Sequence, residues 1–259
     1  MFISGAAAFA IVVCLVIAQK PWREKVHDPL WLAWLCVGLS CWRQFEEHGY
    51  DLRGWHYAFL PCMNADLGDL YQEACAKRVG ACPLTVRATT YINVGLVWIG
   101  FLATIVVVRL WGRGAFALTL NWGVVVVGGL TGHLLPAMKF QTYNPGLFQS
   151  IFAVLIGGWV IARCGGKLAL LSLVYGTVFH GLFVASAIKD IMEQDSPEEL
   201  LFGSVICGSF VVPLFLAHLL GPLSPQEGAQ TDIKGTSMET TQHPQKSQRR
   251  ETKARRRHR

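Results

Sequence analysis

The sequence predicts an all-α protein: a polytopic bundle of about seven membrane-spanning helices, with a disordered basic tail. Three observations support this. The 259 residues are 52% hydrophobic, their mean hydropathy is +0.37, and only 15% are charged, well below the roughly 25% of soluble domains. Several apolar runs reach the length of about 20 residues that a bilayer core of about 30 Å requires. Basic residues recur in alternate connectors between the runs.

The predicted helices follow one another along residues 1–220, which we expect to form one transmembrane domain. They are residues 2–18, 29–48, 90–109, 115–135, 147–162, 168–188 and 200–220. The first run could instead be a cleaved signal peptide. It lacks a basic segment ahead of its apolar part and an Ala-x-Ala cleavage site, so we expect a retained helix.

The connectors predict the orientation of the bundle. Basic residues follow the first, third, fifth and seventh runs, whereas the other connectors are acidic, mixed or cysteine-containing. Positive charge stays on the cytoplasmic side of a membrane. The N-terminus should therefore lie outside the cytoplasm, and we expect a multi-pass protein of the endomembrane (endoplasmic reticulum or secretory) system or the plasma membrane. The basic residues are Lys20, Arg23, Lys25, Arg109, Arg113, Arg163 and Lys167.

Residues 221–259 form a low-hydrophobicity tail that ends in the basic run RRETKARRRHR. Such a segment cannot bury a core, so we expect it to be disordered and cytoplasmic. It holds nine of the 23 Lys and Arg residues, so the formal charge of +6 does not indicate a nucleic-acid partner. The cluster is expected to contact anionic lipid headgroups; the alternative is a sorting or retention signal.

The connector at residues 49–89 is predicted to be an outer loop. Apolar residues spaced three and four apart predict a short amphipathic helix over 64–79, with Asn64 as its cap. Outside the cytoplasm disulfides persist, and three cysteines permit one bond and leave one thiol. The sequence leaves the pairing open among Cys62, Cys75 and Cys82.

Several polar side chains fall inside or at the ends of the predicted spans. An ionisable group inside a membrane is costly and suggests function by default. The predicted topology places the group in one half of the bilayer, on the outer side. Its members are Glu46, Glu47, His48, Asn93, His133 and His180, and Tyr143 and Asn144 lie in the turn that enters the fifth span from that side. Ser172 and Gly176 share a face with His180, so this His should point into the bundle.

The stretch RQFEEHG places Arg43 within reach of both Glu46 and Glu47, because residues three and four apart are neighbours on a helix. Two interpretations follow. The carboxylates can form a buried acid–base site with nearby histidines. Alternatively, the segment is a charged helix end at the headgroup level, with Arg43 extended towards water.

The stretch RQFEEHG resembles the HXXEE-motif membrane proteins, a domain of unknown function, together with PLTVRATTYINVGLVWIGF at 83–101 and GHLLPAMKFQTYNPGLFQSI at 132–151. The resemblance spans roughly residues 30–190. It implies that Glu46 and Glu47 are the motif's Glu pair, and that Arg43 stands where the motif has its His. Asn93, His133 and the turn 143–146 resemble the family's other polar positions. No reaction is implied.

The cofactor is unknown from the sequence. A His at position 43 could bind a metal with the two Glu residues, but Arg is not a metal ligand. A metal is therefore possible but not favoured, since it would need His48, His133 or His180.

Three functions remain open. In the first, a membrane-embedded enzyme uses the Glu/His cluster for acid–base chemistry on a lipid-like substrate drawn from the surrounding lipids. The second is a non-catalytic assembly or interaction protein that uses the loop and the tail. The third, less favoured, is a proton- or ion-coupled transporter, which should carry polar groups through the full membrane depth.

Overall fold

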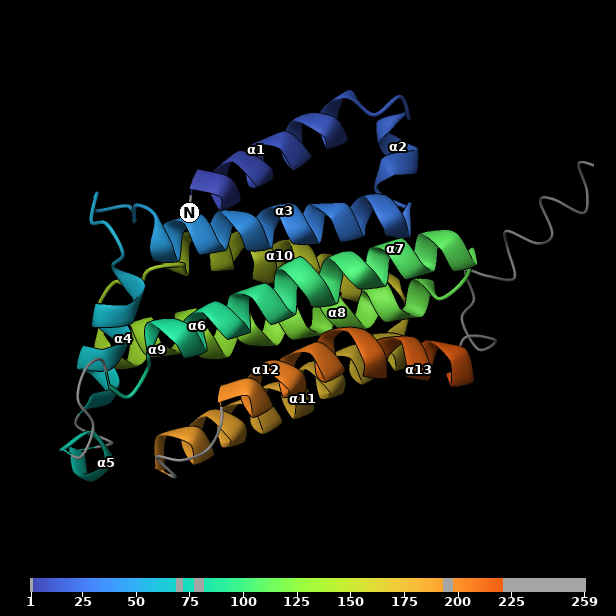
Figure 1. The fold of residues 1–259 in the computed structure, drawn as a ribbon. Helices are drawn as coiled ribbons and strands as arrows, with labels where there is room; N and C mark the ends of the chain where they lie inside the picture. The colour runs from blue at the N-terminus through green and yellow to red at the C-terminus, as the bar shows by residue number, and fades with distance from the viewer. Residues whose placement is uncertain (1, 69–71, 77–81, 193–197, 221–259) are drawn as a thin grey trace, which may run out of the picture. The chain divides into compact units, whose positions relative to one another are not determined.

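A computed structural model describes residues 2–68, 72–76, 82–192 and 198–220 (Figure 1). Every named element in these ranges is a helix. The predicted disordered tail at 221–259 lies outside the described residues, as does part of the predicted helix at 64–79.

The helices correspond to the seven predicted runs, with short helices between the first three. They are α1 (Phe2–Ile17), α2 (Trp22–Lys25), α3 (Pro29–His48), α4 (Phe59–Gly68), α5 (Gln72–Ala76), α6 (Val86–Asn93), η2 (Val94–Phe101), α7 (Leu102–Trp111), α8 (Ala115–Gly129), η3 (Leu130–Leu134), α9 (Leu135–Phe140), α10 (Leu147–Arg163), α11 (Gly166–Met192), α12 (Glu198–Ile206), η4 (Cys207–Val211) and α13 (Val212–Leu220). The segments η2, η3 and η4 are π-helical turns that continue between their α-helical neighbours.

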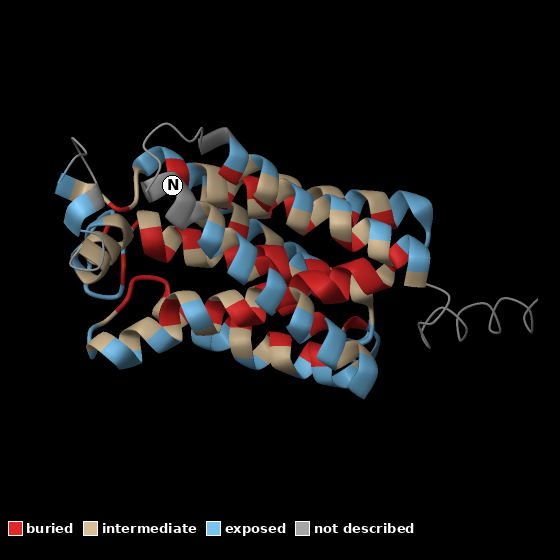
Figure 2. Ribbon diagram, turned by 90° about the horizontal axis from the view of Figure 1, so that it is seen from below, coloured by how far each residue is buried: buried red, intermediate tan, exposed pale blue. Residues whose placement is uncertain are grey.

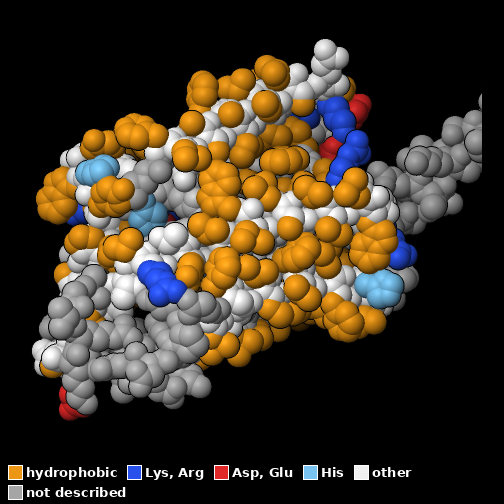
Figure 3. All heavy atoms as spheres, in the orientation of Figure 1, with side chains coloured by type: hydrophobic (Ala, Val, Ile, Leu, Met, Phe, Trp, Pro, Cys, Tyr) orange, Lys and Arg blue, Asp and Glu red, His pale blue; other side chains and the backbone are white. Residues whose placement is uncertain are grey.

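Among the described residues, four continuous helical stretches are long and apolar enough to cross a membrane. They are residues 86–111, 115–140, 166–186 and 200–220. Residues 2–17 and 147–163 are shorter apolar helices. The surface agrees with a membrane protein, because apolar side chains cover much of the face in Figure 3. Soluble monomers rarely expose such continuous apolar surface.

Helix α8 forms the core of this part of the chain. Twelve of its fifteen residues are buried, and it packs against α3, α10 and α11. Figure 2 shows the buried residues, in red, concentrated in the interior of this part of the chain, and few of them belong to α11. The contact between α8 and α11 is close at Gly123 and Gly176, because a Cβ on Gly176 would lie 2.3 Å from the carbonyl oxygen of Gly123. Small residues allow membrane helices to approach in this way.

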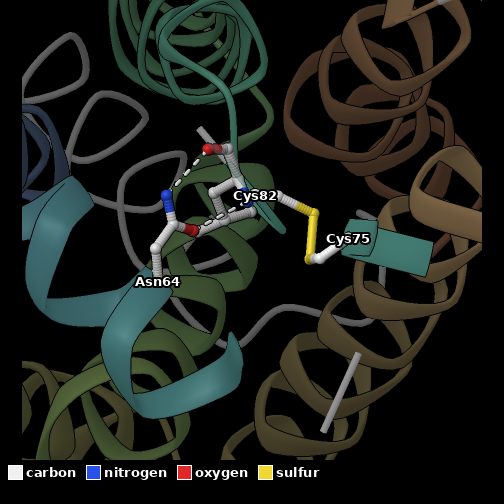
Figure 4. Close-up of a disulfide and its surroundings, with 4 residues drawn as sticks. Asn64, Cys75 and Cys82 are labelled. Atoms are coloured by element: carbon white, nitrogen blue, oxygen red, sulfur yellow. Dashed lines mark hydrogen bonds between the residues drawn. A yellow bond between two sulfur atoms is a disulfide. The ribbon is translucent and has the colours of Figure 1, made fainter. Parts of the chain in front are cut away.

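The connector between α3 and α6 differs from the predicted form. Helix α4 begins at Phe59 and not at Asn64, so Asn64 is not its cap. Its side chain instead bridges to the backbone of Leu84, accepting from the Leu84 N–H at 2.8 Å and donating to the Leu84 carbonyl at 3.0 Å (Figure 4). Sequence periodicity could not reveal this, since the partner lies twenty residues further on.

The cysteines of this connector form one disulfide, between Cys75 and Cys82 (Figure 4). Cys62 remains a free thiol, and its sulfur lies 3.7 Å from the backbone carbonyl oxygen of Tyr143. Burial raises the pKa of this thiol above its ordinary value. Cys62 is therefore the cysteine left over from the three that the sequence could not pair.

Candidate functional site

Glu46 caps the N-terminus of another helix. The helix α10 begins after Gly146 without a side-chain cap of its own. The carboxylate of Glu46 accepts hydrogen bonds from the backbone N–H groups of Phe148 at 3.2 Å and Gln149 at 3.0 Å. A carboxylate at this position satisfies free N–H groups and complements the helix dipole. Glu46 is 3% exposed, so it is a buried anchor between α3 and α10.

Tyr143 supports this anchor from the turn that precedes α10. Its hydroxyl donates to the Glu46 carboxylate and accepts from the backbone N–H of Leu52 at 3.4 Å. Burial and the bond to Glu46 raise the pKa of Tyr143 above its ordinary value. The hydroxyl therefore keeps its proton and acts as a donor. The Arg53 guanidinium lies over the same ring, 4.9 Å from its centre.

Glu47 lies among three basic side chains. Its Oε1 is 3.1 Å from Arg43 Nη1 and 3.1 Å from His133 Nε2, and its Oε2 is 3.4 Å from His48 Nε2. Only 1% of Glu47 is exposed. A carboxylate this deeply buried requires paired charge and hydrogen bonds, and Arg43 supplies a permanent positive charge. The adjacent Glu46 and Glu47 thus have separate partners.

His133 is held at both ring nitrogens. Nδ1 lies 2.9 Å from Asn144 Oδ1. The Asn144 amide nitrogen points to the Gly132 carbonyl, at 3.4 Å, which fixes the amide so that Oδ1 accepts from Nδ1. Nε2 faces Glu47 Oε1 at 3.1 Å and Arg43 Nη1 at 3.4 Å. It can donate to the carboxylate when protonated or accept from the guanidinium when not.

The π-helical turn η3 contains His133. π-Helical turns within α-helices are frequent at functional sites. Gly146 completes the packing here. Its φ of +92° favours glycine, and a Cβ would lie 2.7 Å from His133 Cε1 and 3.2 Å from Glu47 Cγ. No other residue fits without moving the His133 ring.

His48 and Asn93 form the other side of the cluster. Asn93 Oδ1 accepts from Arg43 Nη2 at 3.3 Å, which leaves the Asn93 amide nitrogen to donate to His48 Nε2 at 2.8 Å. In this arrangement Nε2 carries a lone pair and the ring proton is on Nδ1. Gln44 adds a further link, because its amide nitrogen donates to the Asn93 backbone carbonyl at 3.1 Å.

A pocket of about 480 Å³ opens beside this side of the cluster, between α1, α3, α4 and α6. Its volume lies in the range of small-molecule sites. Its polar lining includes Gln44, His48, Asn93 and Thr89, and its apolar lining includes Trp98. Glu46, Glu47 and His133 do not line it. His48 and Asn93 therefore join the buried cluster to an accessible space, and His48 is the one of the two that can carry a proton.

The structure brings together most of the residues singled out from the sequence. Arg43, Glu47, His48, Asn93, His133 and Asn144 form one hydrogen-bonded network, and Glu46 and Tyr143 form a second contact group beside it. His180 bonds to neither Glu side chain; its Nδ1 donates to the Gly176 carbonyl at 3.0 Å.

Sequence reasoning missed Gln44 and Gly146. The sequence did carry a signal for Gln44, which is an uncharged polar residue inside RQFEEHG. The structure shows that this side chain is buried, with 3% exposed. Gly146 had been recognised only as part of a turn. Among the described residues, no group of three or more His, Cys, Asp and Glu side chains is arranged to hold a metal ion.

A family model described as "protein of unknown function with HXXEE motif" matches residues 31–161. This range includes most of α3, with its Glu pair, and extends into α10, the helix that Glu46 caps. No curated protein and no solved structure matches the chain.

Proposed function

Since the chain belongs to the HXXEE-motif family, whose function is unknown, we propose that it is a membrane-embedded enzyme performing acid–base chemistry on a lipid-like substrate. The substrate occupies the 480 Å³ pocket between α1, α3, α4 and α6. The observation that carries this proposal is the position of His48. It lines that pocket and also lies 3.4 Å from the buried carboxylate of Glu47.

The pocket favours an amphiphile. Its apolar part, with Leu60, Val94 and Trp98, suits a hydrocarbon body, and its polar part, with Gln44 and Asn93, suits a hydroxyl or carbonyl group. Few polar groups in a mostly apolar pocket orient a ligand in this way. A substrate of this kind enters from the surrounding lipid.

His48 is the proposed catalytic base, and Nε2 is its reacting atom. In the free protein the Asn93 amide donates to this atom. A substrate hydroxyl, an acidic C–H of the substrate, or a water molecule that attacks the substrate takes the place of that donor, the bond to hydrogen breaks, and the proton forms a new bond to Nε2. Glu47, whose Oε2 lies 3.4 Å from the same nitrogen, stabilises the resulting imidazolium. Returning the proton to the product restores the neutral ring, so isomerisation, cyclisation and hydrolysis are all compatible.

The remaining polar residues hold this arrangement in place. Arg43 bridges Glu47 and Asn93 through its two terminal nitrogens, and His133 holds Glu47 from the opposite helix. These are positioning residues. Glu46 and Tyr143 fix the start of α10, which is a structural role. Arg43 occupies the motif's His position without being a metal ligand, so no metal enters the proposed chemistry.

The proposal includes the topology. The chain has seven spans, of which α1, α3 and α10 are the shorter or more polar ones. This topology places the cluster in the outer half of the membrane, and the membrane is that of the secretory system or the cell surface. The basic connectors support this orientation, and the tail then contacts anionic lipid headgroups on the cytoplasmic side.

A test compares the lipid extracts of cells that express the wild type with those expressing His48→Gln. Gln keeps a polar side chain but accepts no proton in this role. We expect an amphiphilic species to accumulate in the variant and to be consumed when purified wild type is added in vesicles. Arg53→Gln, in the loop and outside the cluster, serves as the control. Identical lipid profiles for wild type and His48→Gln would count against an enzyme.

One observation favours a non-catalytic protein instead. Both Glu side chains are almost completely buried and fully paired, and such networks can serve to hold helices together. In that case Glu47→Gln alters stability or assembly while His48→Gln has no effect on any lipid.

A further inference from the structure

A second cavity, of about 40 Å³, lies beside Arg43 between α3, α8, α10 and α11. Its lining includes Arg43, Gly128, Gln149, Ser150 and His180. It is separate from the proposed substrate pocket, which has no lining residue in common with it. Arg43 borders this cavity and also belongs to the cluster around Glu47.

Three atoms at this cavity have lone pairs that lack a donor among the described residues. Gln149 Oε1 and Ser150 Oγ have no hydrogen-bond partner there, and these residues are 1% and 0% exposed. His180 bonds through Nδ1 to the Gly176 carbonyl, which places its ring proton on Nδ1. The other ring nitrogen, Nε2, lies against Gly128 and carries a lone pair. Buried polar atoms almost always find a partner.

The chemistry of these groups selects the ligand. Gln149 Oε1 and His180 Nε2 both require a donor, which a simple anion cannot provide. A cation is disfavoured because the guanidinium of Arg43 lines the same space. A small neutral molecule with two donor hydrogens and two lone pairs satisfies all of them. The volume is enough for roughly one or two water molecules.

We propose that this cavity is a water-binding site that links His180 to the Arg43–Glu47 pair. The water donates to Gln149 Oε1 and His180 Nε2, accepts from the Arg43 guanidinium, and accepts with its second lone pair from the Ser150 hydroxyl. His180 then belongs to the same polar network as Glu47, although the two side chains are not in contact. The site extends the network from α3 to α11 and does not depend on whether the protein is an enzyme.

Water-edited solid-state NMR on the full chain in lipid bilayers, with ¹⁵N-labelled histidine, tests this proposal. Signals of the ring nitrogens are recorded after magnetisation transfer from water, and loss of a peak in His180→Gln identifies His180. We expect transfer to His180 in the wild type. Absence of transfer, while His48 beside the open pocket receives it, would overturn the proposal.

Two substitutions at one position provide the control. Ser150→Val fills much of the cavity and should abolish transfer to His180, whereas Ser150→Ala enlarges the cavity and should retain it. Equal transfer in both variants would also contradict a site in this cavity. Should Ser150→Val fail to fold, the wild-type spectrum and Ser150→Ala still decide the matter. Lipid turnover is not measured here, so failure of the proposed function leaves this result unaffected.

Discussion

At the N-terminal end of α3, Asp28 caps its own helix: its Oδ1 accepts from the N–H groups of Leu30 at 2.9 Å and Trp31 at 3.2 Å. Near the C-terminal end, Glu46 caps α10, which begins about 100 residues further along the chain. Asp28 is partly exposed and pairs with Lys20 at 2.5 Å, whereas Glu46 is buried with Tyr143.

The two caps differ in what they hold. Loss of the local cap weakens one helix end, which water can solvate. Loss of the distant cap also removes a link between α3 and α10 and leaves buried N–H groups without acceptors. Glu47, next to Glu46, adds the paired charges of the cluster. We therefore expect substitutions at the Glu pair to cost more than those at Asp28.

The largest effect is expected for Glu47→Ala. It leaves Arg43 and His133 without their common acceptor, and removing one partner of a buried ion pair costs about 3–5 kcal/mol. The free energy of unfolding, measured by denaturant titration in detergent micelles, gives the value. Glu47→Gln, which keeps the volume, should lie between Ala and the wild type. A loss below that of Asp28→Ala would refute the proposed difference between the two ends of α3.

Glu46→Ala should be next. It removes the acceptor of two α10 N–H groups and of the Tyr143 hydroxyl, and we expect a loss of about 2–3 kcal/mol. The same titration measures it. Tyr143→Phe removes only one of these bonds and should lose about 1 kcal/mol. If both variants lose the same amount, the backbone contacts of Glu46 carry no stability.

Gly146→Ala sharpens the comparison between buried and exposed positions. Gly54 also has a positive φ, +78°, but a Cβ there meets nothing within 4 Å. Backbone strain should cost both substitutions about 1 kcal/mol, and crowding of His133 should cost Gly146→Ala about 1 kcal/mol more. Thermal unfolding of the two variants checks this. Equal melting temperatures would show that the packing around His133 is loose.

The smallest effect is expected at Asp28, where Asp28→Ala should lose about 1 kcal/mol. Burial alone would raise the pKa of Asp28, but the hydrogen bond from Lys20, together with the N–H groups of Trp31 and Leu30, outweighs it and holds the pKa below 3.8. A lowered pKa in the folded state means that the charge stabilises folding above this ordinary value and is lost as the pH falls through the folded value.

Asn caps helices as well as Asp but does not titrate. The stability advantage of wild type over Asp28→Asn should therefore be constant at neutral pH and shrink once the pH drops below about 4. Unfolding titrations across this range measure it. An advantage that persists at the lowest pH would show that the Lys20 pair contributes nothing.

The helices could be predicted from sequence because apolar length is a local property. The helices predicted at 29–48, 115–135 and 147–162 begin at the same residues as α3, α8 and α10 in the structure. Counting residues along each predicted helix was also enough to place four polar side chains at a similar depth in the bundle, namely Glu47, His48, Asn93 and His133. The seven-span count and the orientation remain predictions, since four stretches meet the membrane-spanning criteria among the described residues.

The contacts within the site could not be predicted in the same way. The partners of Glu46 are backbone N–H groups of α10, and a sequence pattern does not show which helix end faces which carboxylate. His180 was predicted to point into the bundle, and its ring does so, lying against Gly128 on α8. Its depth did not show that it would contact neither Glu46 nor Glu47. Gly146 is required because a Cβ at this position would collide with His133. That closeness results from the packing of the helices, so the sequence does not show it.

The π-helical turn at residues 130–134 has a consequence for comparing related sequences. Such a turn holds about one residue more than an α-helical turn, so every side chain after it is rotated by about 100° relative to an uninterrupted α-helix. A relative one residue shorter between Gly129 and Pro136 should therefore turn its equivalent of His133 away from the Glu pair. The length of this short segment then distinguishes members of the family that keep the polar cluster from members that have lost it, even where both retain the two Glu residues.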